Sequence, residues 1–371
     1  MDQDVIVIGA GPAGLAVAGA LAMRGRRAVV LERSADVGSS WRGHYDRLRL
    51  HTTRRLSGLP GLPIPRSYGR WVARADLVRY LESYRAHFDI DVRTGVEVTG
   101  IAPVVGGGWM VRDASGAEWQ AANVVVAAGY NHTRTLPSWP GQDGFTGSIV
   151  HAGDYRNPGP YADRSVLVVG TGNTGCEIAQ DLGANGAAPV WLAYRTVPNI
   201  VRREKAGIPA QWTGIAVRHL PPRLVDRVGA LMARSEIPDL TAYGLPRATA
   251  GLYSRVLDGA IPVQDVGIID AIRARRVLPV PTLERFDGAD VVLVDGRRLT
   301  PDVVLVATGF TTGLASLVGD LVALDARGRP RVLGGKPAAP GMYFLGYTNP
   351  ISGMLREIAI DARKIAKAIA G

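Results

Sequence analysis

The stretch DVIVIGAGPAGLAVA, Asp4–Ala18, decides the fold. It opens with a β-branched apolar run, which predicts a buried parallel strand because both faces of such a strand are covered. Gly9, Gly11 and Gly14 follow at GxGxxG spacing, and residues 13–23 have helical character. The first glycine permits a tight turn, the second lets backbone approach a pyrophosphate, and the third brings helix and strand together. We therefore predict a dinucleotide-binding loop.

The next predicted strand identifies the nucleotide. It covers residues 27–31 and ends on Glu32, about 20 residues beyond the loop, where a carboxylate accepts hydrogen bonds from a ribose 2′-hydroxyl. An adenine dinucleotide with a free 2′-hydroxyl, such as FAD, suits this loop. The residues expected to contact FAD are Gly9, Gly11, Pro12, Ala13, Gly14, Glu32, Arg33, Ser40, Trp41, Leu48, Ala128, Gly129, Gly346, Gly353 and Met354.

A second strand, loop and helix begins at Ser165, with its glycines at positions 170, 172 and 175. Its following strand, residues 189–193, ends in Tyr194, Arg195 and Thr196, without a carboxylate. An arginine and a hydroxyl suit the 2′-phosphate of NADPH; the alternative is a surface arginine at a strand end. The residues expected to contact NADPH are Gly170, Gly172, Asn173, Thr174, Gly175, Arg195, Thr196, Arg203, Ala307, Thr308 and Gly309.

The remaining pattern predicts an α/β protein with two Rossmann-like, three-layer ββα domains. Residues 109–120 alternate around a turn and indicate a small β-meander, and buried strands then end in Ala-Gly at 128–129 and in Ala-Thr-Gly at 307–309. We expect an FAD domain formed by residues 1–160 and 301–371. The NADPH domain, residues 161–300, is inserted in it.

Composition excludes several classes of function. The net charge is +10, but the arginines are scattered along the 371 residues, so we expect no nucleic-acid partner. Cys176 is the only cysteine, which excludes the cysteine pair of a disulfide reductase and any cysteine-based metal site; we expect no metal. No leader precedes the first strand and no uninterrupted apolar run reaches about 18 residues, so we expect a cytoplasmic protein without a transmembrane segment.

Between the two loops lies FTGSIVHAGDY, in which Phe145, Gly147, His151 and Tyr155 are spaced as FxGxxxHxxxY. With the ATGF run at 307–310, this order resembles the flavin-containing monooxygenase family, whose identifying motif has the same spacing. Further stretches resemble its plant YUCCA-type branch, namely Ser40-Trp41, YDRLRLH at 45–51, PRLVDR at 222–227 and PVQDVG at 262–267. Tyr155 stands where Baeyer–Villiger enzymes carry tryptophan, and His51 where animal members carry asparagine.

The resemblance implies an FAD monooxygenase that uses NADPH and O2, acts through a C4a-(hydro)peroxyflavin and oxidises a small organic molecule. A 2-oxo acid or other carbonyl competes as substrate with nitrogen or sulfur compounds. His51 and Thr52 are the catalytic candidates near the reactive flavin edge, although His51 is equally consistent with a packed histidine. Phe145 and Tyr155 of the motif are expected to act as anchors. For His151 we expect structural hydrogen bonds, with proton transfer as the alternative. An NADPH-dependent electron-transfer reductase and a non-catalytic redox sensor are the rival functions, and a homodimer is possible.

Residues 201–265 form an irregular, helical insertion in the second domain. Leu224, Val225, Val228, Leu231 and Met232 give one apolar helical face, with arginines opposite. A helix packed on the domain by this face is the simplest interpretation; a cap over a substrate entrance and contact with a membrane surface are the alternatives.

Overall fold

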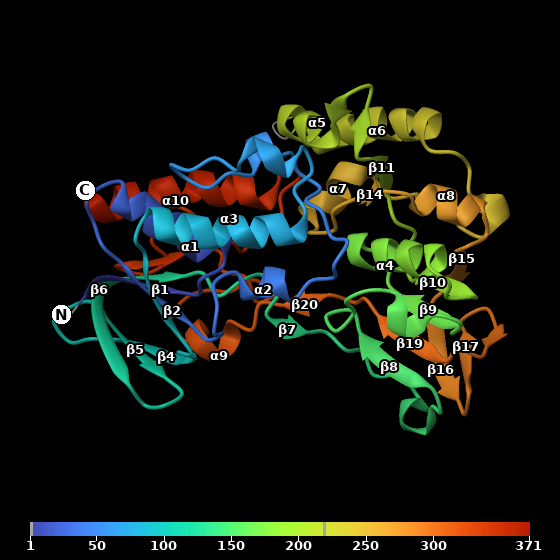
Figure 1. The fold of residues 1–371 in the computed structure, drawn as a ribbon, viewed down its shortest axis with the longest axis horizontal. Helices are drawn as coiled ribbons and strands as arrows, with labels where there is room; N and C mark the ends of the chain where they lie inside the picture. The colour runs from blue at the N-terminus through green and yellow to red at the C-terminus, as the bar shows by residue number, and fades with distance from the viewer. Residues whose placement is uncertain (1–2, 218–219) are drawn as a thin grey trace. The chain divides into compact units, whose positions relative to one another are not determined.

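The computed structural model describes residues 3–217 and 220–371, and the chain forms two compact units (Figure 1). Unit 1 comprises Met1–Thr133 and Phe310–Gly371, and unit 2 is the inserted segment Arg134–Gly309. The boundaries differ from the expected 160 and 300. Residues 134–160 join unit 2 because strand β8 pairs in parallel with β19, inside the sheet of that unit.

Unit 1 is built on a seven-stranded sheet of order β3-β2-β1-β6-β5-β4, with β21 pairing the far part of β6. The sheet is parallel from β3 to β6 and antiparallel from β6 to β4, because β6 pairs β5 near its start and β1 and β21 near its end. Its strands are β1 (Gln3–Ile8), β2 (Val29–Glu32), β3 (Asp91–Thr94), β4 (Val98–Pro103), β5 (Trp109–Asp113), β6 (Glu118–Val126) and β21 (Met342–Phe344).

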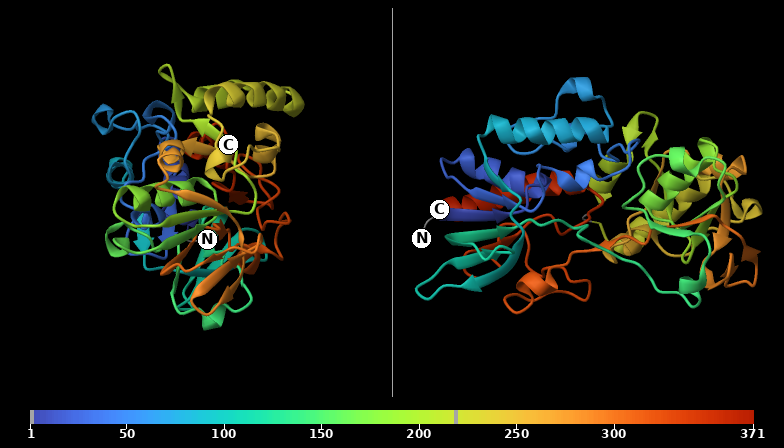
Figure 2. Two further views of the ribbon diagram at one scale, coloured as in Figure 1. Left: turned by 90° about the vertical axis from the view of Figure 1, so that its right-hand side faces the viewer. Right: turned by 60° about the horizontal axis from the view of Figure 1, so that its bottom comes forward.

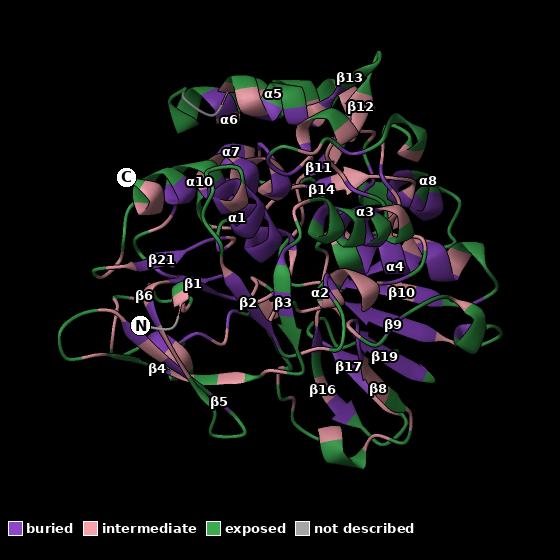
Figure 3. Ribbon diagram, turned by 60° about the vertical axis from the view of Figure 1, so that its left-hand side comes forward, coloured by how far each residue is buried: buried purple, intermediate pink, exposed green. Residues whose placement is uncertain are grey.

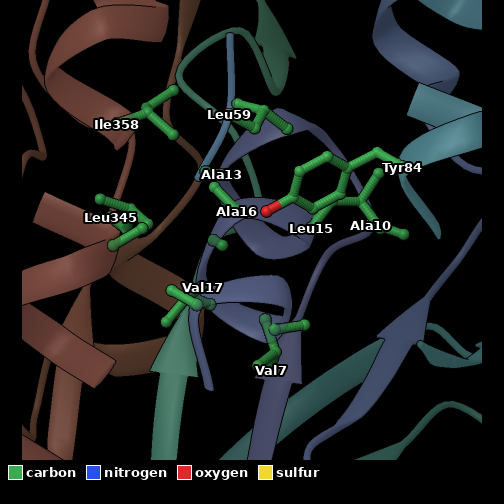
Figure 4. Packing of buried hydrophobic residues seen from close by; sticks show 14 of the residues in the cluster. Val7, Ala10, Ala13, Leu15, Ala16, Val17, Leu59, Tyr84, Leu345 and Ile358 are labelled. Carbon is green, nitrogen blue, oxygen red and sulfur yellow. The ribbon is translucent and has the colours of Figure 1, made fainter. Parts of the chain in front are cut away.

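The two faces of this sheet are covered differently. Val5 and Val7 of β1 pack among helices α1 (Pro12–Ala22), α3 (Arg74–His87) and α10 (Met354–Ala370), as Figure 4 shows around Val7, Leu15 and Tyr84. The alternate residues Ile6 and Ile8 pack with Trp109 and the rest of the meander, and Figure 2 shows helices and meander on opposite faces. Smaller elements are α2 (Ser39–Arg42), η1 (Arg54–Leu56), η2 (Arg66–Tyr68) and α9 (Ala315–Val318).

Unit 2 repeats this architecture on a smaller scale. Its five-stranded sheet, of order β15-β10-β9-β19-β8, is parallel throughout. Helix α4 packs on β9, β10 and α8, while a core on the other face joins the sheet to the β16-β17-β18 meander. The bounds are β8 (Ser148–His151), β9 (Val166–Val169), α4 (Asn173–Ala184), β10 (Val190–Tyr194), α8 (Ile268–Arg273), β15 (Leu278–Pro281), β16 (Leu283–Asp287), β17 (Asp290–Leu293), β18 (Arg298–Leu299) and β19 (Val303–Val306).

The insertion of unit 2 follows β10 and returns to the sheet before α8. Its elements are β11 (Ile200–Arg202), β12 (Glu204–Lys205), β13 (Ile208–Pro209), α5 (Ala210–Val217), α6 (Pro222–Glu236), η5 (Thr241–Tyr243), α7 (Leu252–Leu257) and β14 (Val263–Asp265). Helix α6 corrects one expectation: of its five apolar face residues only Val225 is buried, and the other four are exposed. The remaining short elements are β7 (Thr133–Arg134), η3 (Gln142–Gly144), η4 (Gly159–Tyr161) and β20 (Phe310–Thr311).

No helix within the described ranges is both long and apolar enough to cross a lipid bilayer. Figure 3 shows that the buried residues are concentrated in the strands of the two sheets and in the helices packed on them.

Two buried tyrosines of α3 fasten the segment that follows His51 and Thr52. The Tyr80 hydroxyl donates to Leu62 O at 2.6 Å and accepts from Leu59 N–H at 2.7 Å. The Tyr84 hydroxyl donates to Pro60 O at 2.6 Å. Burial raises the pKa of Tyr80 to about 12 and raises the pKa of Tyr84 as well, so both hydroxyls keep their protons. The loop is therefore fixed through its backbone.

We expect Tyr84→Phe to lower the free energy of unfolding by about 1–3 kcal/mol, because the buried carbonyl oxygen of Pro60 loses its hydrogen-bond donor. Urea denaturation measures the change. Tyr68→Phe is the control, since it removes a hydroxyl from a half-buried ring and should change stability by less than about 0.5 kcal/mol. Equal effects of the two variants would contradict the assignment.

Candidate functional site

The first glycine loop closes by backbone-to-backbone contact. Gly9 has a φ of +102°, and a Cβ at Gly9 would lie 2.6 Å from Ala127 O. A Cβ at Gly14 would lie 1.8 Å from Gly9 O. Gly11, between them, has no atom within 4 Å of its ideal Cβ position. The outer two glycines are thus required by the chain itself, whereas Gly11 borders open space at the start of α1.

The second loop has the same geometry. A Cβ at Gly170 would lie 2.5 Å from Ala307 O, and a Cβ at Gly175 would lie 1.9 Å from Gly170 O, while nothing lies within 4 Å at Gly172. Gly170 also has a positive φ, of +117°. In both loops, the first and third glycines are therefore required by close contact with a backbone carbonyl oxygen.

Both loops fit a pyrophosphate. Gly11 and Gly172 are the N-cap residues of α1 and α4, and neither helix start is capped by a side chain. The first amide groups of a helix favour negative charge, and a Cβ at either glycine would occupy the space through which a phosphate approaches. Each unit therefore carries one candidate dinucleotide site.

Glu32 lies where the sequence predicts it, at the end of β2, and its carboxylate is buried. Glu32 Oε2 accepts from Ala10 N–H at 2.7 Å, and Oε1 accepts from Ser34 N–H at 3.0 Å and from the Ser39 hydroxyl at 3.4 Å. The acid therefore fixes the glycine loop, a role that was not anticipated from the sequence. Its contact with a ribose stays a prediction.

The strand ends beside each loop are also held in place. In unit 1, Ala128 N–H donates to the hydroxyl of the fully buried Tyr347 at 3.1 Å, and Gly129 follows with a φ of +101°. In unit 2, the Thr308 hydroxyl donates to Thr135 O at 2.5 Å, and Gly309 has a φ of +84°. Tyr347 was not singled out in the sequence, because only the fold brings it to β6.

The other residues expected at the first site spread over three segments of unit 1. Pro12 and Ala13 open α1, and Ser40 and Trp41 lie in α2, which is tied to the first loop by Gly38 N–H donating to Ala10 O at 2.9 Å. Leu48 O accepts from Arg74 N–H at 2.8 Å. Residues 346–354 come from the C-terminal segment: Gly346 approaches Ala13, and Gly353 precedes Met354, the first residue of α10.

Arg33, also expected at the first site, is exposed at the end of β2. Its guanidinium donates to His132 Nε2 at 3.0 Å, which makes His132 Nε2 the acceptor. Burial, followed by the Arg33 charge, lowers the pKa of His132. Arg33 is thus paired with a neutral imidazole rather than with a carboxylate.

His51 and Thr52 form a bend between two residues whose backbone is hydrogen-bonded to residues 70–72. Leu50 N–H donates to Val72 O at 2.8 Å, and Arg54 N–H donates to Arg70 O at 2.9 Å. Thr52 Oγ1 lies 2.8 Å from Ser57 Oγ. His51 is half-buried. Together with the tyrosine-bound loop at 59–62, these bonds give the two candidate residues a fixed backbone.

The polar residues expected at the second site differ in their contacts. The Asn173 side chain is hydrogen-bonded within the chain: it donates to Pro262 O at 3.1 Å and accepts from Gln264 N–H at 2.8 Å, which joins α4 to β14. Arg195 and Thr196 are exposed after β10, and Arg195 forms no ion pair with any residue of the described ranges. Thr174 lies in the first turn of α4, and Arg203 lies in the insertion between β11 and β12.

Gln264 is a residue that the sequence did not reveal as a candidate in its own right. Its Oε1 is buried and accepts no hydrogen bond from the residues that the structure describes. Its backbone is bonded to Asn173, at the start of α4. A buried carbonyl without a donor is unfavourable, so this oxygen fits a donor group supplied by a ligand at the second loop.

The four motif residues brace unit 2 from within. Phe145 packs on Phe286 of β16 at a ring-centroid distance of 4.8 Å. Gly147 lets Asp302 O approach, since a Cβ there would lie 2.8 Å from it. The Tyr155 hydroxyl, fully buried, donates to Asp181 Oδ2 of α4 at 2.7 Å.

His151 completes the bracing by joining β8 to the Ala307–Gly309 turn. Its Nδ1 accepts from Gly153 N–H at 3.1 Å, so the ring proton is on Nε2, which donates to Gly309 O at 3.2 Å. Burial lowers the pKa of His151, the Gly309 carbonyl opposes this, and the Arg134 charge adds to it. A neutral imidazole with a fixed tautomer is a structural bridge between two elements that flank the loop.

Cys176 is buried in α4, and burial raises the pKa of its thiol to about 12. A buried thiol of this kind is not a nucleophile at neutral pH. The described residues also contain no group of three His, Cys, Asp or Glu side chains arranged to hold a metal ion.

Alanine variants of the loop glycines separate close backbone packing, at Gly14 and Gly175, from open space for a ligand, at Gly11 and Gly172. Gly14→Ala and Gly175→Ala should lower the free energy of unfolding by about 3 kcal/mol or more, because each new methyl group meets a backbone carbonyl. Gly11→Ala and Gly172→Ala should change it by less than about 1 kcal/mol while weakening dinucleotide binding more than about tenfold. Urea denaturation and calorimetric titration measure the two effects; similar stability losses in all four variants would contradict this division.

Gln264→Leu should leave the free energy of unfolding of the ligand-free protein unchanged or raise it by up to about 1 kcal/mol, because a buried oxygen without a donor is removed. It should weaken binding at the second loop about threefold to tenfold. Thermal unfolding with and without the nicotinamide dinucleotide measures both. A destabilised ligand-free variant with unchanged affinity would show that the oxygen has a donor within the chain.

His151 predicts a pH dependence of stability. Its pKa in the folded chain lies below its unfolded value of about 6.5, so its contribution is fully present above about pH 6.5. It is lost as pH falls through the window between the unfolded and the folded pKa, because the unfolded chain takes up the proton first. Urea unfolding at several pH values should show a shallower acid-side decline for His151→Gln; parallel curves would contradict the assignment.

Comparisons with known proteins agree with this architecture. The family described as pyridine nucleotide-disulphide oxidoreductase matches residues 6–206, more than half of the chain. Since Cys176 is the only cysteine, the match reflects the shared dinucleotide-binding fold and not a dithiol. The chain is 32% identical to the probable indole-3-pyruvate monooxygenase YUCCA3 of Arabidopsis thaliana, over 98% of this chain and 86% of that protein. It is 34% identical to the indole-3-pyruvate monooxygenase YUCCA1 of Oryza sativa, over 98% and 90%.

Solved structures give the same result. A double-substitution variant of the flavin monooxygenase from Stenotrophomonas maltophilia superimposes with a TM-score of 0.75 at 26% identity, covering 100% of this chain and 99% of that chain. An oxidised steroid monooxygenase bound to NADP has the same fold, with a TM-score of 0.77 at 20% identity over 99% and 85% of the two chains. The chain belongs to the flavin-containing monooxygenases, on their YUCCA-type branch, and is a flavoprotein monooxygenase.

Proposed function

We propose that the chain is an NADPH- and O2-dependent FAD monooxygenase that oxidises a small organic substrate, with a 2-oxo acid as the leading class. The observation that carries this proposal is the difference between two otherwise equivalent loops. The first is followed by the buried carboxylate of Glu32, and the second by the exposed pair Arg195 and Thr196. One loop thus suits a free ribose hydroxyl, and the other suits a 2′-phosphate.

Support for FAD at the first loop comes from the hydrogen bonds of Glu32. Three donors hold the carboxylate in one orientation beside Ala10, and an ionised carboxylate has about four acceptor positions. It therefore retains capacity for a ribose hydroxyl while it fixes the loop. Gly11 and Gly129, which have no atom within 4 Å of their ideal Cβ positions, would give FAD close backbone approach, and the α1 N-terminus would face its pyrophosphate.

Support for NADPH at the second loop comes from Arg195. A guanidinium without a carboxylate partner in the described ranges is available to a phosphate, with which it forms strong charge-assisted bonds. Thr171 Oγ1 donates to Thr196 O at 3.3 Å, which ties the glycine loop to this segment. The steroid monooxygenase of the same fold is bound to NADP.

When bound, the flavin would supply the redox chemistry, accepting hydride from the nicotinamide and activating dioxygen. The chain's own residues would bind the two nucleotides, orient them and exclude water. In each unit, polar side chains near the loop hold the backbone: Tyr347 at Ala128 in unit 1, and Thr308 at Thr135 and His151 at Gly309 in unit 2. This agrees with residues that position a cofactor.

The substrate class rests on the relatives. The matched plant proteins are named indole-3-pyruvate monooxygenases, and indole-3-pyruvate is a 2-oxo acid. We therefore propose attack at a carbonyl adjacent to a carboxylate as the leading chemistry. Oxygenation of nitrogen or sulfur is the second candidate, and His51 and Thr52 are the residues proposed to distinguish the two.

Stopped-flow mixing of the NADPH-reduced flavoprotein with oxygen tests the proposal. The expected result is a flavin absorbance intermediate distinct from both oxidised and reduced forms, which decays faster with a 2-oxo acid than with a thioether or an amine. One oxygen atom from labelled O2 should appear in the product. Direct reoxidation without an intermediate or label incorporation would favour the electron-transfer reductase, and protein that binds no FAD would overturn the proposal.

Arg195→Ser should reduce the preference for NADPH over NADH, expressed as the ratio of kcat/KM, by about 10- to 100-fold, since one charge-assisted bond to the 2′-phosphate is lost. Steady-state NAD(P)H oxidation measures the ratio. Arg273→Ser is the matched control, because Arg273 is an exposed arginine of the same unit at the end of α8. An unchanged ratio in Arg195→Ser would remove the basis for assigning NADPH to this loop.

A further inference from the structure

The insertion of unit 2 exposes an unusual amount of apolar surface. Among the described residues, seven of the thirteen exposed large hydrophobic side chains lie between positions 208 and 232. They are Ile208, Trp212, Leu220, Leu224, Val228, Leu231 and Met232. Single exposed apolar residues are normal, whereas a concentration of this kind marks an interaction site.

Four of these side chains, Leu224, Val228, Leu231 and Met232, lie on one side of α6 by their helical spacing, and we call them the α6 stripe. Leu220 lies two residues before the helix begins. The helix is attached to unit 2 by a different side, where Val225 is 8% exposed and Gly229 lies against Leu252 of α7. Leu231, by contrast, is 66% exposed. The stripe therefore is not the face that packs on the domain.

One flank of the stripe is basic. Arg223, Arg227 and Arg234 are exposed and follow the stripe at helical spacing. None of the three forms an ion pair with a residue of the described ranges. Figure 1 draws α6 with α5 along an edge of unit 2.

The acidic residues of α6 do not neutralise this flank. Asp226 is turned to α7, where its carboxylate accepts from Tyr253 N–H at 2.6 Å and from Ser254 N–H at 3.3 Å. Glu236 pairs with Lys205 of β12. The outward side of the helix thus combines an aliphatic stripe with unneutralised arginines.

We propose that the α6 stripe is a docking surface for an anionic lipid bilayer, on which α6 lies in the plane of the headgroups. An aliphatic stripe beside arginines is the composition of interfacial helices, whose apolar side chains enter the headgroup and acyl boundary while the arginines meet lipid phosphates. Trp212 of α5 adds an indole, which favours the same boundary. A second copy of this face would present the same arginines and no opposite charge.

Sedimentation of the full-length protein with extruded vesicles tests the proposal. One vesicle population contains phosphatidylcholine alone, and the other also contains phosphatidylglycerol. We expect the protein to pellet with the anionic vesicles and to bind the neutral ones at least about tenfold more weakly, with binding to the anionic vesicles falling as salt is raised.

Two variants separate the apolar and charged contributions. Leu231→Glu should weaken binding at least about tenfold, because it removes apolar contact and adds repulsion from the headgroups. Arg227→Glu should weaken it and reduce its salt dependence. Val294→Glu is the control, since Val294 is 58% exposed in the distant β17–β18 turn of the same unit. Because all three side chains are exposed, thermal unfolding should be unchanged.

Three results would overturn the proposal. The first is absence of binding to anionic vesicles, and the second is equal loss of binding in all three variants. The third is a self-association of the wild-type chain, measured by light scattering, that Leu231→Glu abolishes while vesicle binding is absent; this would identify the stripe as an interface between copies. NADPH oxidation in each variant serves as a folding control, because none of the substituted residues lies in either glycine loop.

Discussion

The structure depends on one contact made twice: a glycine carbonyl oxygen that touches the backbone of the following helix. Gly9 O lies where a Cβ on Gly14 would be, and Gly170 O lies where a Cβ on Gly175 would be. This contact sets the distance between strand and helix in each unit. The first glycine of each loop also lies against the residue that follows a neighbouring strand, Ala127 after β6 and Ala307 after β19. All the other site residues are arranged around a backbone that is already closed.

The FxGxxxHxxxY segment extends this logic to the edge of the second sheet. Its members reach different parts of unit 2, namely β16 through Phe145, the start of β19 through Gly147, the turn after β19 through His151, and α4 through Tyr155. The spacing is fixed because β8 runs in register with β19, with His151 opposite Val306. The motif residues thus hold elements of unit 2 together by packing and hydrogen bonds.

The local signals in the sequence specified much of this architecture. Glycine spacing, β-branched runs and the terminal residues Glu32 and Arg195 predicted two loops, the parallel strands beside them and the insertion of one unit in the other, since these signals lie in short stretches of sequence. Features that depend on distant contacts were not predicted. Tyr347 reaches Ala128 only in the folded chain, Asn173 is engaged by β14, and residues 134–160 join the second sheet through β8. Periodicity identified the apolar side of α6 but not that it faces outward.

The charged residues that follow the two loops, Glu32 and Arg195, differ in how well the fold tolerates their substitution. Glu32 is buried and holds three donors of its own unit, so a replacement there alters the loop together with whatever the loop binds. Arg195 is exposed and engaged with no carboxylate of the described ranges, so a replacement there leaves the fold alone. A single substitution after the second loop can therefore change which ligand that loop prefers, whereas a substitution of Glu32 also disturbs the atoms that hold the first loop in its fold.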